Sequence, residues 1–283
     1  MKQPGDGSVP HARALLAAGK RRQDSRAAPI GQTLVIAGPG VPGDAWTARR
    51  GLVAVAAPLA FLLALAAAGI PDLPLCATLA GFGLVVAIAH AGLEGFHPAN
   101  RFGAANAVTL ARAAGAALLG GVALAGGPPP GATVATPAGM VGAAYLLAGF
   151  SAALLALDGI DGWLARRAGL ASRFGARFDM EVDALTALVL SALAWQMGKA
   201  GPWVLGIGLA RYAFVLAGAV WPRLAAPPPP SNRRKAVCVL QLGTLTLVLL
   251  PGVTPPVSAA LAAFALAALA WSFARDIRRL ARG

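Results

Sequence analysis

Charged side chains are scarce in this sequence. Only 12% of its 283 residues are Asp, Glu, Lys or Arg, whereas a typical soluble domain has about 25%. Hydrophobic residues make up 57%. They fall in continuous blocks of about 17 to 25 residues rather than in alternation, and such blocks are long enough to cross a bilayer as helices. The scarcity of charge therefore excludes an ordinary soluble domain, and we predict an all-α polytopic membrane protein.

Cysteine is also rare. The two cysteines, Cys76 and Cys238, both lie in apolar segments. Their number and spacing match no disulfide framework and no zinc motif. We interpret both as buried small hydrophobic residues.

Acidic residues are fewer than basic ones, 11 against 24, which gives a formal charge of +13. The basic residues collect beside and between the apolar blocks, as charges that orient a membrane protein do. This distribution favours contact with anionic lipid headgroups and argues against nucleic acid as a partner.

The apolar blocks predict eight transmembrane helices. They lie at about 51–70, 75–92, 105–126, 139 to the acidic residues near 158, 176–198, 203–221, 236–250 and 255–273. If the N-terminus is cytoplasmic, the opposite loops 71–74, 127–138, 199–202 and 251–254 contain a single basic residue, Lys199. This asymmetry predicts the orientation, and we expect a bacterial inner-membrane protein whose functional site faces the cytoplasm.

Four of the few acids lie within 26 residues, at Asp158, Asp161, Asp179 and Asp183. Their i, i+3 and i, i+4 spacings put each pair on one face of a helix. Four converging carboxylates repel one another unless cations neutralise them, and oxygen ligands suit Mg²⁺, Mn²⁺ or Ca²⁺. Such ions beside arginines indicate a phosphate or diphosphate substrate. For Asp158 and Asp161 taken alone, an interfacial salt-bridge network is the alternative.

Glu181 lies on the other side of the same helix, and we interpret it as a solvent or headgroup contact. A second polar feature is the stripe Asn106, Thr109 and Arg112, spaced i, i+3, i+6 on an otherwise apolar helix. It is either a ligand-facing stripe or a set of hydrogen bonds between helices with a snorkelling arginine.

The acidic stretch resembles one family. Asp158, two residues, Asp161, Gly162, two residues, Ala165, Arg166, eight residues, Gly175, three residues, Asp179, three residues and Asp183 match without a gap the signature of the CDP-alcohol phosphatidyltransferases. The polar stripe resembles the start of that family's first core helix. The resemblance covers residues 99–283 as a six-helix catalytic domain. Residues 51–98 would be two additional helices, and residues 1–50 a basic cytoplasmic tail that is disordered or lies on the membrane.

The resemblance implies transfer of a phosphatidyl group from a CDP-linked lipid to an alcohol, with release of CMP, in phospholipid biosynthesis. It implies two Mg²⁺ or Mn²⁺ ions bound by Asp158, Asp161, Asp179 and Asp183, with Asp183 also acting as general base. It implies a CDP-lipid site at Asn106, Thr109, Gly162, Ala165, Arg166 and Gly175. By analogy with the family we also expect a homodimer.

The identity of the acceptor stays open. Arg112, Arg177, Arg211 and Lys235 could form a basic pocket for a phosphorylated acceptor, or several of them could be orienting charges. Members that use glycerol phosphate tend to have a second lysine where this sequence has Val237, so a neutral acceptor is the alternative. Two other functions are retained as alternatives: a membrane prenyltransferase acting on isoprenoid diphosphates, and a non-catalytic lipid-binding protein.

Overall fold

The structure is a computed structural model that describes residues 44–70, 72–96, 102–126, 137–168, 173–221 and 231–281. Most of the predicted tail, residues 1–43, lies outside these ranges. The described part of the chain contains eight α-helices, one short 3₁₀-helix and no strand. The prediction of an all-helical fold is therefore confirmed.

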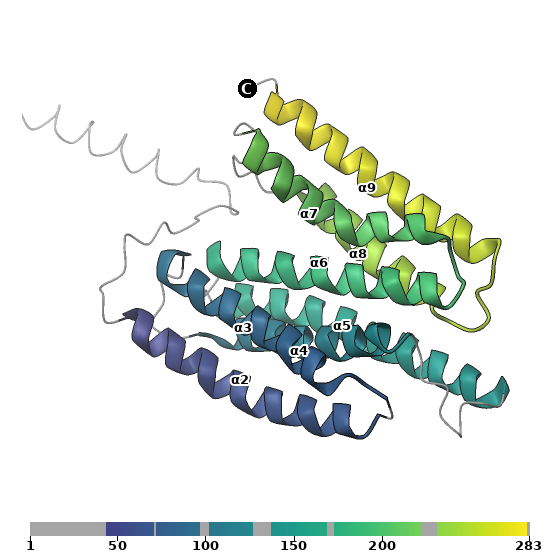
Figure 1. Cartoon of the computed structure of the whole chain (residues 1–283). Helices are drawn as coiled ribbons and strands as arrows, with labels where there is room; N and C mark the ends of the chain where they lie inside the picture. Colours follow the sequence, from purple (N-terminus) through teal and green to yellow (C-terminus); the bar gives the residue numbers. More distant parts are fainter. Residues whose placement is uncertain are drawn as a thin grey trace, which may run out of the picture. The chain divides into compact units, whose positions relative to one another are not determined.

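The helices follow the order of the predicted apolar blocks (Figure 1). They are α2 (Asp44–Ala68), α3 (Leu75–Phe96), α4 (Ala104–Leu124), α5 (Pro137–Ala168), α6 (Arg173–Gln196), η1 (Pro202–Val204), α7 (Leu205–Val220), α8 (Asn232–Val248) and α9 (Val257–Ala281).

Six of these helices are long and apolar enough to cross a membrane: α2, α3, α4, α5, α7 together with η1, and α9. Two others differ. α6 carries a high density of charged residues in its first half, and α8 has only 17 residues. The six apolar helices indicate an integral membrane protein.

Three helices extend further than hydropathy predicts. α5 has 32 residues and continues through Asp161 to Ala168, α9 continues through the basic end of the chain to Ala281, and α2 begins at Asp44, within the predicted tail. Hydropathy predicts only the part of a helix that lies in the lipid. The helix itself continues for as long as the backbone hydrogen bonds form and the residues favour a helix.

Helix α6 lies at the centre of the packing, against α3, α4, α7 and α8. Its first half contributes Phe174, Phe178 and Val182 to a hydrophobic core shared with α2, α3 and α4. Its second half contributes Leu190 and Leu193 to a larger core shared with α4, α5 and α7–α9. Because other helices surround α6, it can carry polar side chains that a lipid-facing helix would not tolerate.

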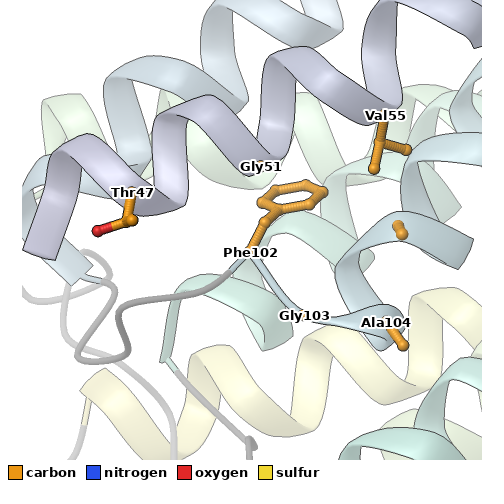
Figure 2. Close-up of a pocket in the computed structure, with 7 residues that line it drawn as sticks. Thr47, Gly51, Val55, Phe102, Gly103 and Ala104 are labelled. Atoms are coloured by element: carbon orange, nitrogen blue, oxygen red, sulfur yellow. The ribbon is translucent and has the colours of Figure 1, made fainter.

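Two glycines allow unusually close approach between helices. A Cβ atom on Gly208 of α7 would lie 2.2 Å from the Cα atom of Leu188 on α6, and one on Gly51 of α2 would lie 2.9 Å from the Cβ atom of Phe102. Beside the second contact, a cavity of about 400 Å³ separates α2 from the start of α4 (Figure 2). Small residues therefore set the helix spacing here, as is typical of membrane bundles.

Lys199, the one basic residue in the predicted outer loops, is only 7% exposed. Its amino group donates to the carbonyl oxygens of Leu250 and Val253, at 2.8 Å each, and its own carbonyl accepts a hydrogen bond from Ser258. Burial lowers the pKa of the Lys199 amino group. The lysine thus ties together the turn that follows α8, where the carbonyl of Leu250 also accepts from the backbone N–H of Val253.

Candidate functional site

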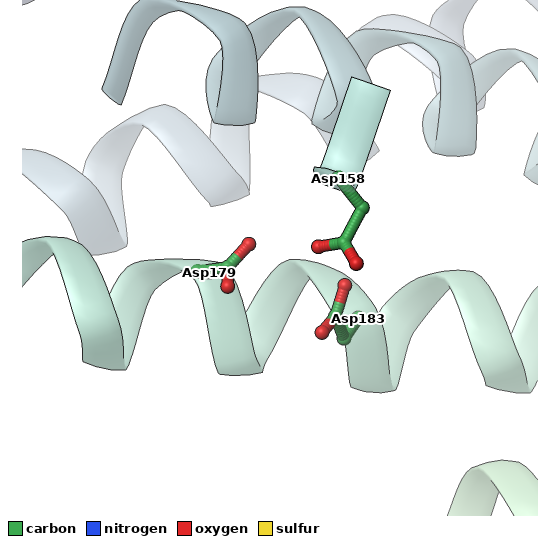
Figure 3. Close-up of side chains that lie close together, drawn as sticks. All are labelled: Asp158, Asp179 and Asp183. Atoms are coloured by element: carbon green, nitrogen blue, oxygen red, sulfur yellow. The ribbon is translucent and has the colours of Figure 1, made fainter. Parts of the chain in front are cut away.

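Three of the four predicted aspartates lie close together. Asp158 comes from α5, and Asp179 and Asp183 come from successive turns of α6 (Figure 3). Each offers a carboxylate oxygen, and the three oxygens lie within 4.8 Å of one another. The helices α5 and α6 thus bring together side chains 21 to 25 positions apart in the sequence. We call this group the aspartate cluster.

The remaining signature residues of α5 belong to its helical backbone, but their side chains lie outside the described residues. They are Asp161, Gly162, Ala165 and Arg166, and their predicted roles stay predictions. Gly175 is described and lies four residues, or one turn, before Asp179 on α6. It therefore leaves that turn of the helix without a side chain next to the cluster.

Arg112 of α4 lies among the three aspartates and is only 2% exposed. One guanidinium nitrogen, Nη1, lies 2.9 Å from Oδ1 of Asp158 and 2.6 Å from Oδ1 of Asp179. The other, Nη2, donates to Oδ1 of Asp183. The structure gives Arg112 three carboxylate partners, and its predicted role in binding the alcohol acceptor stays a prediction. The i, i+6 stripe placed Arg112 on the correct face of α4 but did not reveal what faces it.

Sequence reasoning missed the role of Cys238 on α8. Its thiol donates to Oδ2 of Asp183 across 3.2 Å, so both oxygens of Asp183 have protein partners in this structure.

Cys238 is half-buried, and Cys76 is exposed on α3. The prediction of two buried small hydrophobic residues was therefore wrong for Cys76, because the apolar face of α3 is turned away from the bundle at that position. Only the spacing of Cys238 three residues before Gln241 hinted at an inward-facing position.

Asn106 and Thr109 of the polar stripe are buried, at 7% and 3% exposed. Asn106 donates to the carbonyl of Phe102, and Thr109 donates to the carbonyl of Ala105 across 3.1 Å. Both bonds run back along the same helix, which is the usual way to satisfy a polar side chain in an apolar bundle. Their predicted role in CDP-lipid binding stays a prediction.

The other predicted acceptor residues are spread around the cluster. Arg211 of α7 donates to Glu181 of α6 across 2.6 Å. Because Glu181 is two residues from both Asp179 and Asp183, this pair lies on the opposite side of α6 from the aspartate cluster. Glu181 thus has a protein partner that the interpretation as a solvent or headgroup contact did not include, while 33% of its side chain stays exposed. Arg177 and Lys235 are exposed, and Lys235 lies one turn before Cys238 on α8.

A second ion-pair group joins α8 to α9. Arg233 donates to Asp276 and to the hydroxyl and carbonyl oxygens of Ser272, and Arg234 lies 3.7 Å from Asp276. The guanidinium groups of Arg233 and Arg275 lie over the ring of Trp271. This group contains one carboxylate and three guanidinium groups, so it has no excess of negative charge for a metal ion.

The aspartate cluster does suit a divalent cation. All of its donors are oxygen atoms, which Mg²⁺ and Mn²⁺ prefer. Octahedral ligands about 2.1 Å from Mg²⁺ lie roughly 3 to 4 Å apart, so the three carboxylates themselves would need only small movements to coordinate an ion. Among the described side chains, the three carboxylates and one guanidinium carry a net charge of −2, which one divalent ion would balance.

Comparison with known proteins gives one match. A family model described as CDP-alcohol phosphatidyltransferase matches residues 102–274, which is more than half of the chain. The match begins at Phe102, just before α4, and ends within α9. No curated protein and no solved structure matches the chain.

Proposed function

The chain belongs to the CDP-alcohol phosphatidyltransferase family, and from this premise we propose that it transfers a phosphatidyl group from a CDP-linked lipid, such as CDP-diacylglycerol, to an alcohol and releases CMP. The observation that carries the proposal is the aspartate cluster, in which three carboxylate oxygens from two helices lie within 4.8 Å of one another. Three acids around one arginine carry an excess of negative charge, which is costly in a membrane protein and therefore points to a function rather than to stability.

The proposed reaction forms one bond and breaks one. The acceptor hydroxyl oxygen bonds to the phosphorus atom that carries the lipid, and the bond between that phosphorus atom and the oxygen that bridges it to the CMP phosphate breaks. Asp183 takes the hydroxyl proton as general base and later gives it to water. Asp158, Asp161, Asp179 and Asp183 would hold two Mg²⁺ or Mn²⁺ ions, which supply positive charge to the diphosphate and to the leaving CMP.

The substrates would approach the cluster along α4 and α6. Asn106 and Thr109 lie on the α4 face that also carries Arg112, and Gly175 leaves space one turn before Asp179 on α6. We propose that these residues, with Gly162, Ala165 and Arg166, bind the CDP group. Glycine at positions 162 and 175 and alanine at position 165 would let a nucleotide approach the helix backbone closely.

For the membrane arrangement we propose eight spans, with α6 and α8 crossing inside the bundle of more apolar helices. The charge asymmetry of the loops supports a cytoplasmic active site in a bacterial inner membrane. The role of Lys199 as a partner of loop carbonyls strengthens this reading, since the single basic residue on the outer side has a structural reason to be there. We also propose residues 99–283 as the catalytic domain and a homodimer as the assembly.

The identity of the acceptor is tested by comparing CMP release with different alcohols. Arg177 and Lys235 are exposed basic residues on α6 and α8, which supports a phosphorylated acceptor, and Val237 in place of a second lysine supports a neutral one. Purified protein is incubated with CDP-diacylglycerol, Mn²⁺ or Mg²⁺, and a panel of glycerol phosphate, inositol phosphate, inositol, serine and glycerol. The acceptor that stimulates CMP release most identifies the class.

The same assay tests the proposed function through Asp183→Asn. The substitution keeps the shape of the side chain but removes the base, so CMP release should fall by about 10²- to 10⁴-fold. Asp72→Asn is the matched control, because Asp72 is exposed in the turn between α2 and α3 and its φ of 60° is one that asparagine tolerates.

Unchanged CMP release in Asp183→Asn would contradict the general-base assignment. Absence of CMP release from the unmodified protein with every acceptor would contradict the proposed activity. In that case, release of inorganic diphosphate from an isoprenoid diphosphate would indicate the prenyltransferase alternative.

A further inference from the structure

The position of Arg112 is unusual for a residue beside a metal site. Its Nη1 atom lies between Oδ1 of Asp158 and Oδ1 of Asp179, at 2.9 and 2.6 Å. A divalent ion held by the same two carboxylates would need the space that this guanidinium nitrogen occupies. The guanidinium nitrogen and the ion would therefore overlap, and both carry positive charge.

We propose that Arg112 is an exchangeable counter-ion: it holds the aspartate cluster together without metal, leaves the carboxylates when divalent ions bind, and then binds the diphosphate of the substrate. This rests on the proposed function, because it takes the cluster to be the metal site. Arg112 is in this sense a positioning residue for the metal and a binding residue for the anion.

Charge balance supports the exchange. The four aspartates of the signature carry four negative charges, which two divalent ions neutralise without Arg112. Its guanidinium is then a surplus buried cation, since Arg112 is 2% exposed and cannot simply turn to solvent. A buried cation needs an anionic partner, and the diphosphate would be the new anion at this site. Arginine suits both states because its planar group pairs with carboxylate and phosphate oxygens alike.

The contacts of the other side chains favour exchange over fixed pairing. Asp183 uses both oxygens, one toward Arg112 and the other toward Cys238. Each carboxylate oxygen can accept from two partners, so a metal ion or a proton at Asp183 would share these oxygens with the guanidinium and the thiol, or displace them. The contact to Arg112 would open together with those to Asp158 and Asp179, because all three belong to one rigid guanidinium group.

The test measures Mn²⁺ affinity without any lipid or nucleotide. Full-length protein in detergent is titrated with Mn²⁺, and free Mn²⁺ is followed by electron paramagnetic resonance. When an internal cation competes for the site, the apparent affinity for Mn²⁺ equals the intrinsic affinity multiplied by the fraction of protein in which the site is free. Arg112→Gln should therefore bind Mn²⁺ about tenfold more tightly, and Arg278→Gln, an exposed arginine on α9, should bind it like the unmodified protein.

A second measurement has the opposite expected sign. With Mn²⁺ saturating, binding of cytidine 5′-diphosphate is measured by calorimetry. Arg112→Gln should bind it about tenfold more weakly, because the released guanidinium no longer meets the diphosphate. A purely structural role for Arg112 would weaken both ligands together, so tighter Mn²⁺ with weaker diphosphate separates the two explanations.

Equal or weaker Mn²⁺ affinity in Arg112→Gln would overturn the proposal. If that variant does not yield a monodisperse protein, Arg112→Lys decides, because one ammonium group cannot bridge all three carboxylates in the same way and should compete less with Mn²⁺. If the Arg112→Lys variant then binds Mn²⁺ no more tightly than the unmodified protein, the proposal is overturned. Neither titration requires turnover, so failure of the proposed transferase activity would show in the CMP assay alone.

Discussion

Two buried cations lie at different ends of α6, and their partners differ. Arg112 is surrounded by three carboxylates, whereas Lys199 donates to two neutral carbonyl oxygens. Both are less than 10% exposed. The amino group of Lys199 meets neutral loop carbonyl oxygens. Around Arg112, by contrast, the described carboxylates carry two more negative charges than the guanidinium neutralises. A buried cation among excess acids marks a site that can accept further cations, and a buried cation among carbonyls marks a structural joint.

The largest expected effect on CMP release comes from removing one negative charge from the four aspartates of the signature, three of which surround Arg112 at one end of α6. Asp161→Ala should lower CMP release by on the order of 10²-fold or more, because we propose Asp161 as a metal ligand, and loss of a ligand costs more than loss of a residue that merely supports one. The protein should still insert into the membrane and elute as a single species, because Asp161 lies near the end of α5. The measurement is CMP release combined with Mn²⁺ titration.

Normal Mn²⁺ affinity in Asp161→Ala would break the comparison, because the excess of negative charge would then have no bearing on metal binding. Asp72→Asn again serves as the control for loss of one acid elsewhere.

A smaller effect, on stability rather than on CMP release, is expected for Lys199 at the other end of α6. Lys199→Met removes the amino-group donor from the carbonyl of Val253 and one of two donors from that of Leu250, which also accepts from the N–H of Val253. This loss should lower the free energy of unfolding by about 1 to 3 kcal/mol. The readout is the thermal unfolding midpoint in detergent. Mn²⁺ affinity and CMP release below that midpoint should stay unchanged.

A loss of Mn²⁺ affinity in Lys199→Met at unchanged stability would contradict the assignment of Lys199 as a structural residue. Arg278→Gln, the loss of an exposed cation, is expected to change neither property.

The smallest effect is expected at Cys238, which adds a neutral donor to the carboxylate end. A thiol is a weak donor, so Cys238→Ala should lower CMP release less than about tenfold. Cys238→Ser, which restores a donor to Asp183, should recover part of the loss. Cys76→Ala, on the exposed face of α3, is the matched control.

If Cys238→Ala and Cys238→Ser were equally active, the contact to Asp183 would have no part in placing that carboxylate, and Arg112 would be its only positioning partner among the described residues.

The sequence predicted the order and approximate limits of the helices because apolar blocks of membrane length leave few alternatives. It also predicted that Asp158, Asp179 and Asp183 converge, because their spacing fits two neighbouring helices. It could not predict partners across helices: Arg211 facing Glu181, or Cys238 facing Asp183, depends on which face of α7 or α8 turns toward α6. Helical periodicity gives the faces of one helix, but the rotation of its neighbour is set by packing, as at Gly208 and Leu188.

The contact between Phe102 and Gly51 also limits how the protein could be shortened. The family match begins at Phe102, yet this residue lies against α2, and the same core includes Leu110 and Ala113 of α4, both fully buried. A form trimmed to the matched region would expose that flank of α4, the helix that carries Arg112. The first two described helices thus cover one flank of the helix that carries Arg112, and a shortened protein would have to retain them or resurface α4.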